Sequence, residues 1–337
     1  MYSPDRAQAR FFAQKPLMAF DSSRPFAEQK QQITAKLTEL LGDRPTAVPL
    51  NPVVEYEKVY DTFTERRIVF DVEPAMQAVC LLCIPRLGKK RYPLVICLTG
   101  HSTGMHISMG RPLYDRDDTN ISHSNIAVQA LERGYAALCL EQRGFGERRT
   151  GYVWSTDDNG APRCHSTAMN SLLMGRTLIG ERCWDISRAI DLALTYEEID
   201  GDRIVCTGNS GGGTATYYAA CMDERIRVAM PSCSVCTFRS SITAMRHCEC
   251  NYIPGIAKYM DMGDMAAAIA PRKLIVINGD EDPIFPMQGV QEAFDTIRTI
   301  YRAAGVPQNC MLTTGHGGHQ YYKRNAWEAF DRIVGWE

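Results

Sequence analysis

The sequence predicts an α/β fold with a mostly parallel central sheet and helices on both of its faces. From Pro93 onward, short apolar runs alternate with longer segments of helical periodicity, which is the pattern of strand–helix units in a parallel sheet. In addition, the turn Gly208-Asn209-Ser210-Gly211-Gly212 stands between an apolar run and a small-residue helical segment. With 337 residues, 45% of them hydrophobic, the chain can bury the core of one large domain.

Residues 1–50 are interpreted as an amino-terminal extension of a catalytic domain that spans residues 51–337. The first 25 residues look irregular. An amphipathic helix is expected over residues 26–41, because the apolar side chains there fall on one stripe and Gly42 ends it. We expect this helix to pack on the domain.

Residues 52–84 are rich in Val, Tyr, Phe and Ile and predict antiparallel strands. The following elements then alternate: strand 93–98, helix 124–133, strand 135–140, helix 181–196, strand 203–207, helix 214–220, strand 273–278, strand 309–314 and helix 320–336. Two insertions, about 145–174 and 232–265, fit no core element. Both follow the carboxyl ends of strands, so they are expected to overhang a pocket, with Tyr152 and Trp154 available to stack on a ring.

Ser210 is the predicted nucleophile. In a Gly-x-Ser-x-Gly turn between a strand and a helix, the glycines allow a sharp bend that exposes the serine hydroxyl. Such a serine needs a histidine base and a carboxylate to orient that base, and in this chain topology the acid precedes the histidine. Asp282 is the preferred acid over Asp280 and Glu281, because it lies beyond the turn that follows a buried strand and two prolines stiffen its loop.

The predicted base is His319, in the segment Gly315-His316-Gly317-Gly318-His319. Glycines let this loop pass close to the nucleophile, and histidine has a pKa suited to general-base work near neutrality. His319 is preferred over His316 because it directly precedes the last helix. The backbone N–H groups of Gly211 and His101 are the predicted oxyanion hole, with Ser102 as the alternative to His101.

These motifs resemble the α/β-hydrolase superfamily, and within it the bacterial serine esterases that are dienelactone-hydrolase-like or acetyl-xylan-esterase-like. The resemblance covers residues of about 50–337, and its matching positions are 99–101, 141–147, 180–185, 208–212, 270–272, 279–286 and 317–319. The family pattern places the acid at Asp282 and the base at His319. There are two departures: the oxyanion loop begins with Thr99-Gly100 rather than His-Gly, and Ser210 stands where dienelactone hydrolases use cysteine.

Composition excludes several partners. The net charge of −2, with acidic and basic residues interspersed, argues against nucleic acid and anionic membrane surfaces as partners. No apolar run approaches a membrane span, and the first residues lack a secretory signal, so a cytoplasmic location is expected. Arg143 and Glu147 are expected to brace loops, paired with each other or with Asp185.

Several of the 13 cysteines, such as Cys80, Cys97 and Cys139, lie in apolar strands and are expected to act as small hydrophobic residues. Cys233, Cys236, Cys248 and Cys250, with the neighbouring His247, form the one candidate zinc set, but Cys-x-Cys is a poor chelating pair. We therefore expect no metal and no cofactor. Whether these four cysteines do more than pack is left open.

The function implied by the triad and by the resemblance is hydrolysis of carboxylic esters through an acyl-enzyme, with short-acyl esters of carbohydrates, such as acetyl esters, as substrates. An amidase or peptidase using the same triad is the alternative, and a non-catalytic binding protein of the same fold is the third hypothesis. The natural substrate, the acyl-chain preference and a homo-oligomeric state are left open.

Overall fold

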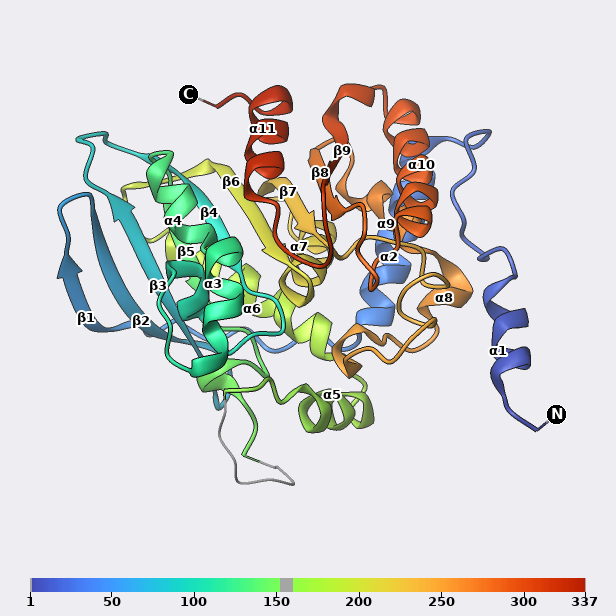
Figure 1. Ribbon diagram of the computed structural model, residues 1–337, viewed down its shortest axis with the longest axis horizontal. Coiled ribbons are helices and arrows are strands. Elements are labelled where there is room, and N and C mark those ends of the chain that lie inside the picture. Colours follow the sequence, from blue (N-terminus) through green and yellow to red (C-terminus); the bar gives the residue numbers. More distant parts are fainter. Residues whose placement is uncertain (1, 152–159, 337) are drawn as a thin grey trace.

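The central sheet of the computed structural model, which describes residues 2–151 and 160–336, runs through the whole molecule (Figure 1). Its strands lie in the order β1-β2-β3-β5-β4-β6-β7-β8-β9. They are β1 (Val53–Val59), β2 (Phe63–Glu73), β3 (Met76–Pro85), β4 (Tyr92–Leu98), β5 (Ala136–Leu140), β6 (Ile199–Asn209), β7 (Ile226–Ser232), β8 (Lys273–Gly279) and β9 (Cys310–Gly315).

The pairing of the strands confirms the predicted α/β fold. From β5 to β9 all neighbours are parallel, while β1, β2 and β3 are antiparallel to their neighbours at one edge. The central strands β4 and β5 are buried along their whole length, because side chains on both faces of the sheet are covered by helices. A strand that is buried on both faces needs a continuous run of apolar residues, rather than alternating apolar and polar ones, and both strands have such a run.

The helices lie on both faces of the sheet. On one face, α4 and α11 are joined where Trp327 Nε1 donates to Gln129 Oε1 at 3.1 Å. On the other face lie α6, α7, α9 and α10. The helix bounds are α1 (Asp5–Phe12), α2 (Phe26–Leu41), α3 (Asp118–Ser124), α4 (Ile126–Glu132), α5 (Cys164–Leu173), α6 (Leu178–Ala193), α7 (Gly211–Met222), α8 (Ile256–Tyr259), α9 (Met262–Ile269), α10 (Met287–Ala303) and α11 (Lys323–Ile333).

The amino-terminal segment contains two helices of different character. Helix α2 occupies the predicted residues, and its buried Ile33, Leu37 and Leu41 join the main core, where the helix packs against α9. The prediction that the first 25 residues are irregular was wrong for α1. That helix buries none of its side chains, and it consists largely of residues with a good preference for helix, such as Ala, Arg and Gln.

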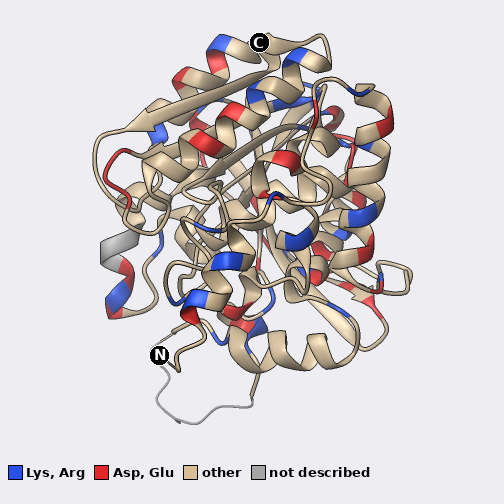
Figure 2. Cartoon of the chain, turned by 90° about the vertical axis from the view of Figure 1, so that its right-hand side faces the viewer, with Lys and Arg blue, Asp and Glu red and all other residues tan. Residues whose placement is uncertain are grey.

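Helix α6 begins earlier than predicted, because Thr177 caps its first turn by accepting a hydrogen bond from the Gly180 N–H at 3.1 Å. Charged residues of both signs are interspersed over the elements in view in Figure 2. Within residues 2–336, apart from 152–159, no helix is both long and apolar enough to cross a bilayer.

Candidate active site

Ser210 lies in the sharp turn between β6 and α7. Its backbone has φ 54° and ψ −121°, a conformation that side-chain-bearing residues rarely adopt and that costs about 1–3 kcal/mol. The turn fits only because its flanking residues are glycines. A Cβ at Gly208 would lie 2.5 Å from the Leu98 carbonyl oxygen, and one at Gly212 would lie 2.3 Å from the same atom. The strained turn at Ser210 is therefore held by close backbone packing against β4.

Asp282 and His319 form a hydrogen-bonded pair. The Nδ1–H of His319 donates to Asp282 Oδ2 at 2.8 Å, and the other carboxylate oxygen accepts from the backbone N–H groups of Ile284 (2.8 Å) and Phe285 (3.1 Å). Burial alone would raise the pKa of Asp282, but the hydrogen bond and charge of His319, with these two N–H groups, outweigh it and lower the pKa. Asp282 is thus held as a carboxylate that fixes the orientation of His319.

The alternative residues also form a pair, but on the surface. His316 Nδ1 lies 3.1 Å from Asp280 Oδ2, and the side chains are 85% and 43% exposed, against 20% for His319 and 0% for Asp282. Only the buried pair is next to the pocket that Ser210 lines. The two Asp–His pairs therefore differ in exposure and in access to the serine.

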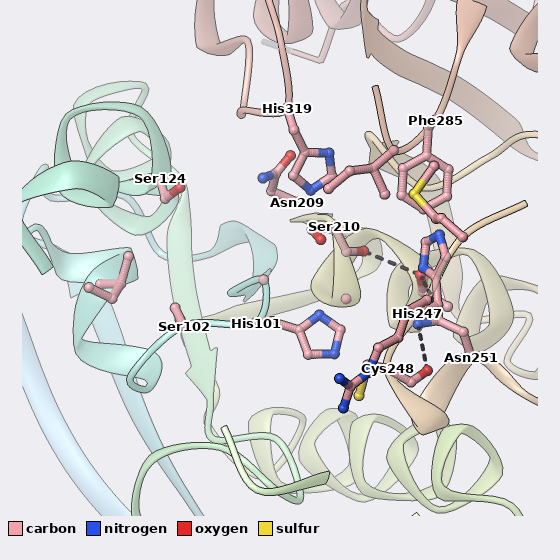
Figure 3. A pocket seen from close by; sticks show the side chains of 17 residues that line it. His101, Ser102, Ser124, Asn209, Ser210, His247, Cys248, Asn251, Phe285 and His319 are labelled. Atoms are coloured by element: carbon pink, nitrogen blue, oxygen red, sulfur yellow. Dashed lines mark hydrogen bonds between the residues drawn. The ribbon is translucent and has the colours of Figure 1, made fainter. Parts of the chain in front are cut away.

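Ser210 and His319 line one pocket of about 460 Å³ (Figure 3). Among the described residues, His319 Nε2 has no hydrogen-bond partner, so this nitrogen is available to a serine hydroxyl. The His319 ring stacks on Phe285, with ring centroids 5.9 Å apart and an interplanar angle of 17°. Phe285 was not identified from the sequence, although its position directly after the acid loop is a signal that could have found it.

The loop after β4 supplies the second candidate oxyanion donor. The Ser102 N–H is already bonded to the Gly100 carbonyl at 2.7 Å, whereas the His101 N–H has no backbone partner among the described residues. Gly211 begins α7, so its N–H is among the unpaired donors of a helix start. Of the two candidates in this loop, His101 is therefore the better placed to act with Gly211.

The second insertion lines the pocket with five residues. They are Met245, Arg246, His247, Cys248 and Asn251. His247 packs edge-on against Phe285, and burial, followed by the charges of two neighbouring histidines, lowers its pKa. From the first insertion, residues 145–151 and 160–174 contribute nothing to this pocket lining. Tyr152 and Trp154 lie outside the described residues.

The loop after β5 is braced by a buried ion-pair network. Arg143 donates to both oxygens of Asp185 at 2.8 Å and lies 2.7 Å from Glu73. The expected pairing of Arg143 with Asp185 is confirmed. The expected partners of Glu147 were wrong, because its carboxylate turns toward β2 and binds Arg67 at 2.9 Å. Arg143 is scaffold in this arrangement, since its cation is surrounded by carboxylates.

The candidate zinc set from the sequence is split by the fold. The thiol of Cys233 donates to the Gln320 carbonyl at 3.2 Å, and Cys236 lies against Pro286, away from Cys248 and Cys250. Sequence spacing grouped these residues, but in the fold Cys248 and Cys250 lie together and apart from Cys233 and Cys236.

Comparison with known proteins finds a relative in sequence and several similar folds. A curated relative, "Putative hydrolase YtaP" of Bacillus subtilis (strain 168), is 24% identical over 298 residues, which are 87% of this chain and 93% of the relative. Among solved structures, the "putative acetyl xylan esterase" of Bacteroides fragilis NCTC 9343 superposes with a TM-score of 0.76 at 17% identity, covering 97% of this chain and 84% of the other.

A glucuronoyl esterase from Solibacter usitatus superposes with a TM-score of 0.69 at 17% identity, covering 96% and 97% of the two chains. At these identities the structural likeness shows the fold alone. The family assignment comes from the sequence, since the model of the Abhydrolase family matches residues 7–332, and the match includes helix α2. The resemblance to α/β-hydrolases is thereby confirmed, and the chain belongs to the Abhydrolase family.

Proposed function

We propose that the protein is a serine hydrolase that cleaves carboxylic esters, and that its substrates are short-acyl esters, above all acetyl esters of carbohydrates. The observation that carries the proposal is the buried Asp282–His319 pair beside Ser210, in a pocket lined by both residues of the proposed nucleophile–base couple. The partner is accordingly a small-molecule or oligosaccharide ester.

In the proposed mechanism, Ser210 Oγ attacks the acyl carbon while its proton passes to His319 Nε2. Asp282 holds the proton on Nδ1 and stabilises the imidazolium that forms. The N–H groups of Gly211 and His101 bind the oxyanion. The imidazolium then gives its proton to the leaving alcohol, and a water molecule, activated by His319, releases the acyl group as a carboxylic acid.

The substrate class is supported by relatives rather than by the pocket alone. A "putative acetyl xylan esterase" and glucuronoyl esterases are among the structures that share this fold, and their names describe enzymes that cleave carbohydrate esters. The pocket also offers polar groups suited to a sugar, including Asn251 and Arg246, next to the apolar side chains of Ile284 and Phe285 that would contact an acyl group.

The first test is turnover of 4-nitrophenyl acetate, butyrate and octanoate by the wild type and by Ser210→Ala. We expect turnover to fall with chain length and kcat/KM to drop by about 10³-fold or more in the variant. A fluorophosphonate probe should label the wild type and leave Ser210→Ala unlabelled.

Acetylated xylo-oligosaccharides and a methyl ester of glucuronic acid form the second panel. Release of acetate from the former but no cleavage of the latter supports the acetyl assignment. Activity that survives Ser210→Ala contradicts the nucleophile. Labelling by the probe with cleavage of amides but not of esters would favour the amidase hypothesis instead.

A further inference from the structure

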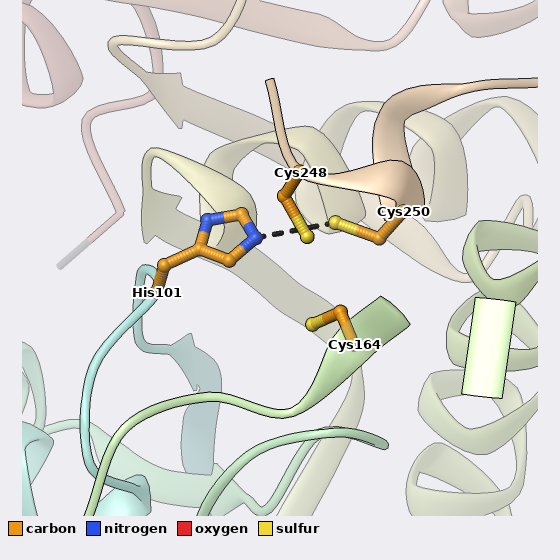
Figure 4. A group of neighbouring side chains, drawn as sticks. All are labelled: His101, Cys164, Cys248 and Cys250. Carbon is orange, nitrogen blue, oxygen red and sulfur yellow. Dashed lines mark hydrogen bonds between the residues drawn. The ribbon is translucent and has the colours of Figure 1, made fainter. Parts of the chain in front are cut away.

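One imidazole and three thiol groups come together next to the oxyanion loop. They are His101 after β4, Cys164 at the start of α5, Cys248 directly before the short 3₁₀ turn Glu249–Asn251, and Cys250 within that turn. Their ligand atoms all lie within 4.8 Å of one another, and Figure 4 shows the three sulfur atoms and the His101 ring facing a common centre. We propose that these four residues bind one Zn²⁺ as a structural site.

The donor set and its spacing suit zinc. A Cys₃His set is one of the closed tetrahedral combinations of structural zinc sites, and soft thiolate ligands select zinc over the hard cations. With ordinary bond lengths, such a site separates sulfur from sulfur by about 3.8 Å and sulfur from nitrogen by about 3.6 Å. His101 Nε2 lies 3.2 Å from Cys250 Sγ, so an adjustment of a few tenths of an ångström brings this pair to ligand spacing.

A buried cation balances the charge of this site. Arg182 is 1% exposed, and its Nη2 lies 3.3 Å from Cys164 Sγ. Its remaining hydrogen bonds go to the Arg143 carbonyl, Nη1 has no partner, and within the described residues no carboxylate pairs with it. An unpaired buried cation is costly. Zn²⁺ with three thiolates and a neutral histidine carries a net charge of −1, which is the anion that Arg182 lacks.

A disulfide explains the same residues less completely. Three cysteines cannot pair evenly, so one thiol and His101 would be left over. A disulfide is also uncharged and would leave Arg182 without a counter-ion. The metal uses all four groups and neutralises the arginine.

The site would join the catalytic loop to both insertions. His101 belongs to the proposed oxyanion loop, Cys164 to the first insertion, and Cys248 to the second, where it also lines the catalytic pocket. The His101 ring packs so closely on the start of α7 that a Cβ at Gly211 would lie 2.7 Å from it. Because the protein fills all four coordination positions, the metal would position these segments and take no part in the reaction.

The test measures metal content in protein purified with a reductant and without chelators. By inductively coupled plasma mass spectrometry we expect about one zinc per chain in the wild type. Cys164→Ser and Cys248→Ser should lose most of it, and the matched control Cys236→Ser, a buried thiol outside the cluster, should retain it. Replacement by Co²⁺ should give the intense visible bands of a tetrahedral thiolate site.

A readout that does not depend on folding of the variants is chelation of the wild type. A strong chelator should lower the Tm of the wild type and of Cys236→Ser, and added Zn²⁺ should restore it. Wild type that holds no zinc after refolding with Zn²⁺ and reductant overturns the proposal, as does a disulfide among Cys164, Cys248 and Cys250. These results are independent of esterase turnover, so each proposal can fail without the other.

Discussion

The two groups of side chains next to the catalytic pocket are assembled in different ways. Ser210, Asp282 and His319 each follow a strand of the sheet, namely β6, β8 and β9, and the parallel pairing of these strands brings their carboxyl ends to one edge. The proposed zinc ligands instead come from one core loop, which supplies His101, and from the two insertions, which supply Cys164, Cys248 and Cys250. The positions of the first group are determined by the register of the strands, and the positions of the second group by how the long loops pack.

This difference determines what a local pattern can reveal. A residue directly after a buried strand is placed by the strand, so chain order is enough to predict its neighbours. A residue inside an insertion is placed by contacts that are remote in sequence. Cys164 and Cys250 are separated by two core strands and two helices, and no local spacing joins them.

The largest expected effect in the strand-positioned group, after loss of Ser210, is that of Asp282→Asn. The amide cannot stabilise the imidazolium and favours the wrong tautomer of His319, so we expect kcat on 4-nitrophenyl acetate to fall by about 10⁴-fold. Circular dichroism should show an intact fold. The matched control is Asp280→Asn, which alters only the exposed pair with His316 and should change kcat by less than about twofold. Equal losses in the two variants would break the distinction between the pairs.

The buried network beneath the first insertion is expected to matter for stability instead. Asp185 is fully buried between Arg143 and Arg148. The substitution Asp185→Asn removes the carboxylate charge that neutralises both guanidinium groups. Loss of one member of such a buried pair costs about 3–5 kcal/mol in the free energy of unfolding. Unfolding in guanidinium chloride measures this change in the free energy of unfolding. Asp191→Asn on the same helix, a partly exposed carboxylate, should cost about 1 kcal/mol or less.

Glu141 provides a smaller, pH-dependent effect under the oxyanion loop. Burial raises its pKa from 4.5 to about 7, and its carboxylate accepts a hydrogen bond from the Met105 N–H at 3.1 Å. Between these two values the folded state binds more protons than the unfolded state, so Glu141 lowers stability as pH rises through this range. Its contribution is most favourable below pH 4.5, and the loss is complete above pH 7.

Glu141→Gln removes that titration. The free energy of unfolding of the variant, relative to the wild type, should increase from pH 4.5 to pH 8 by up to about 3 kcal/mol. Chemical denaturation across this range measures the difference. Parallel pH profiles for the two proteins would show that the carboxyl group titrates alike in the folded and unfolded states.

Much of the architecture was predictable because it depends on local patterns. The parallel sheet follows from apolar runs such as β4 and β8, and the nucleophile turn follows from glycines that backbone packing requires. Helix α1 was missed because nothing is buried on it, and the partner of Glu147 was missed because a loop side chain can turn toward either neighbour. Which side chains of the second insertion line the pocket, Met245 and Cys248 among them, depends on how that insertion packs, and no local pattern reveals it.

The contact between His101 and Gly211 limits which residues can occupy these two positions in related proteins. A methyl group at position 211 has no room while the imidazole lies against it, with ring atoms 2.7 and 2.8 Å from the place of a Cβ. Positions 101 and 211 should therefore covary among homologues. Chains that keep the histidine must keep glycine after the nucleophile, and chains with a smaller residue at 101 can accept alanine there.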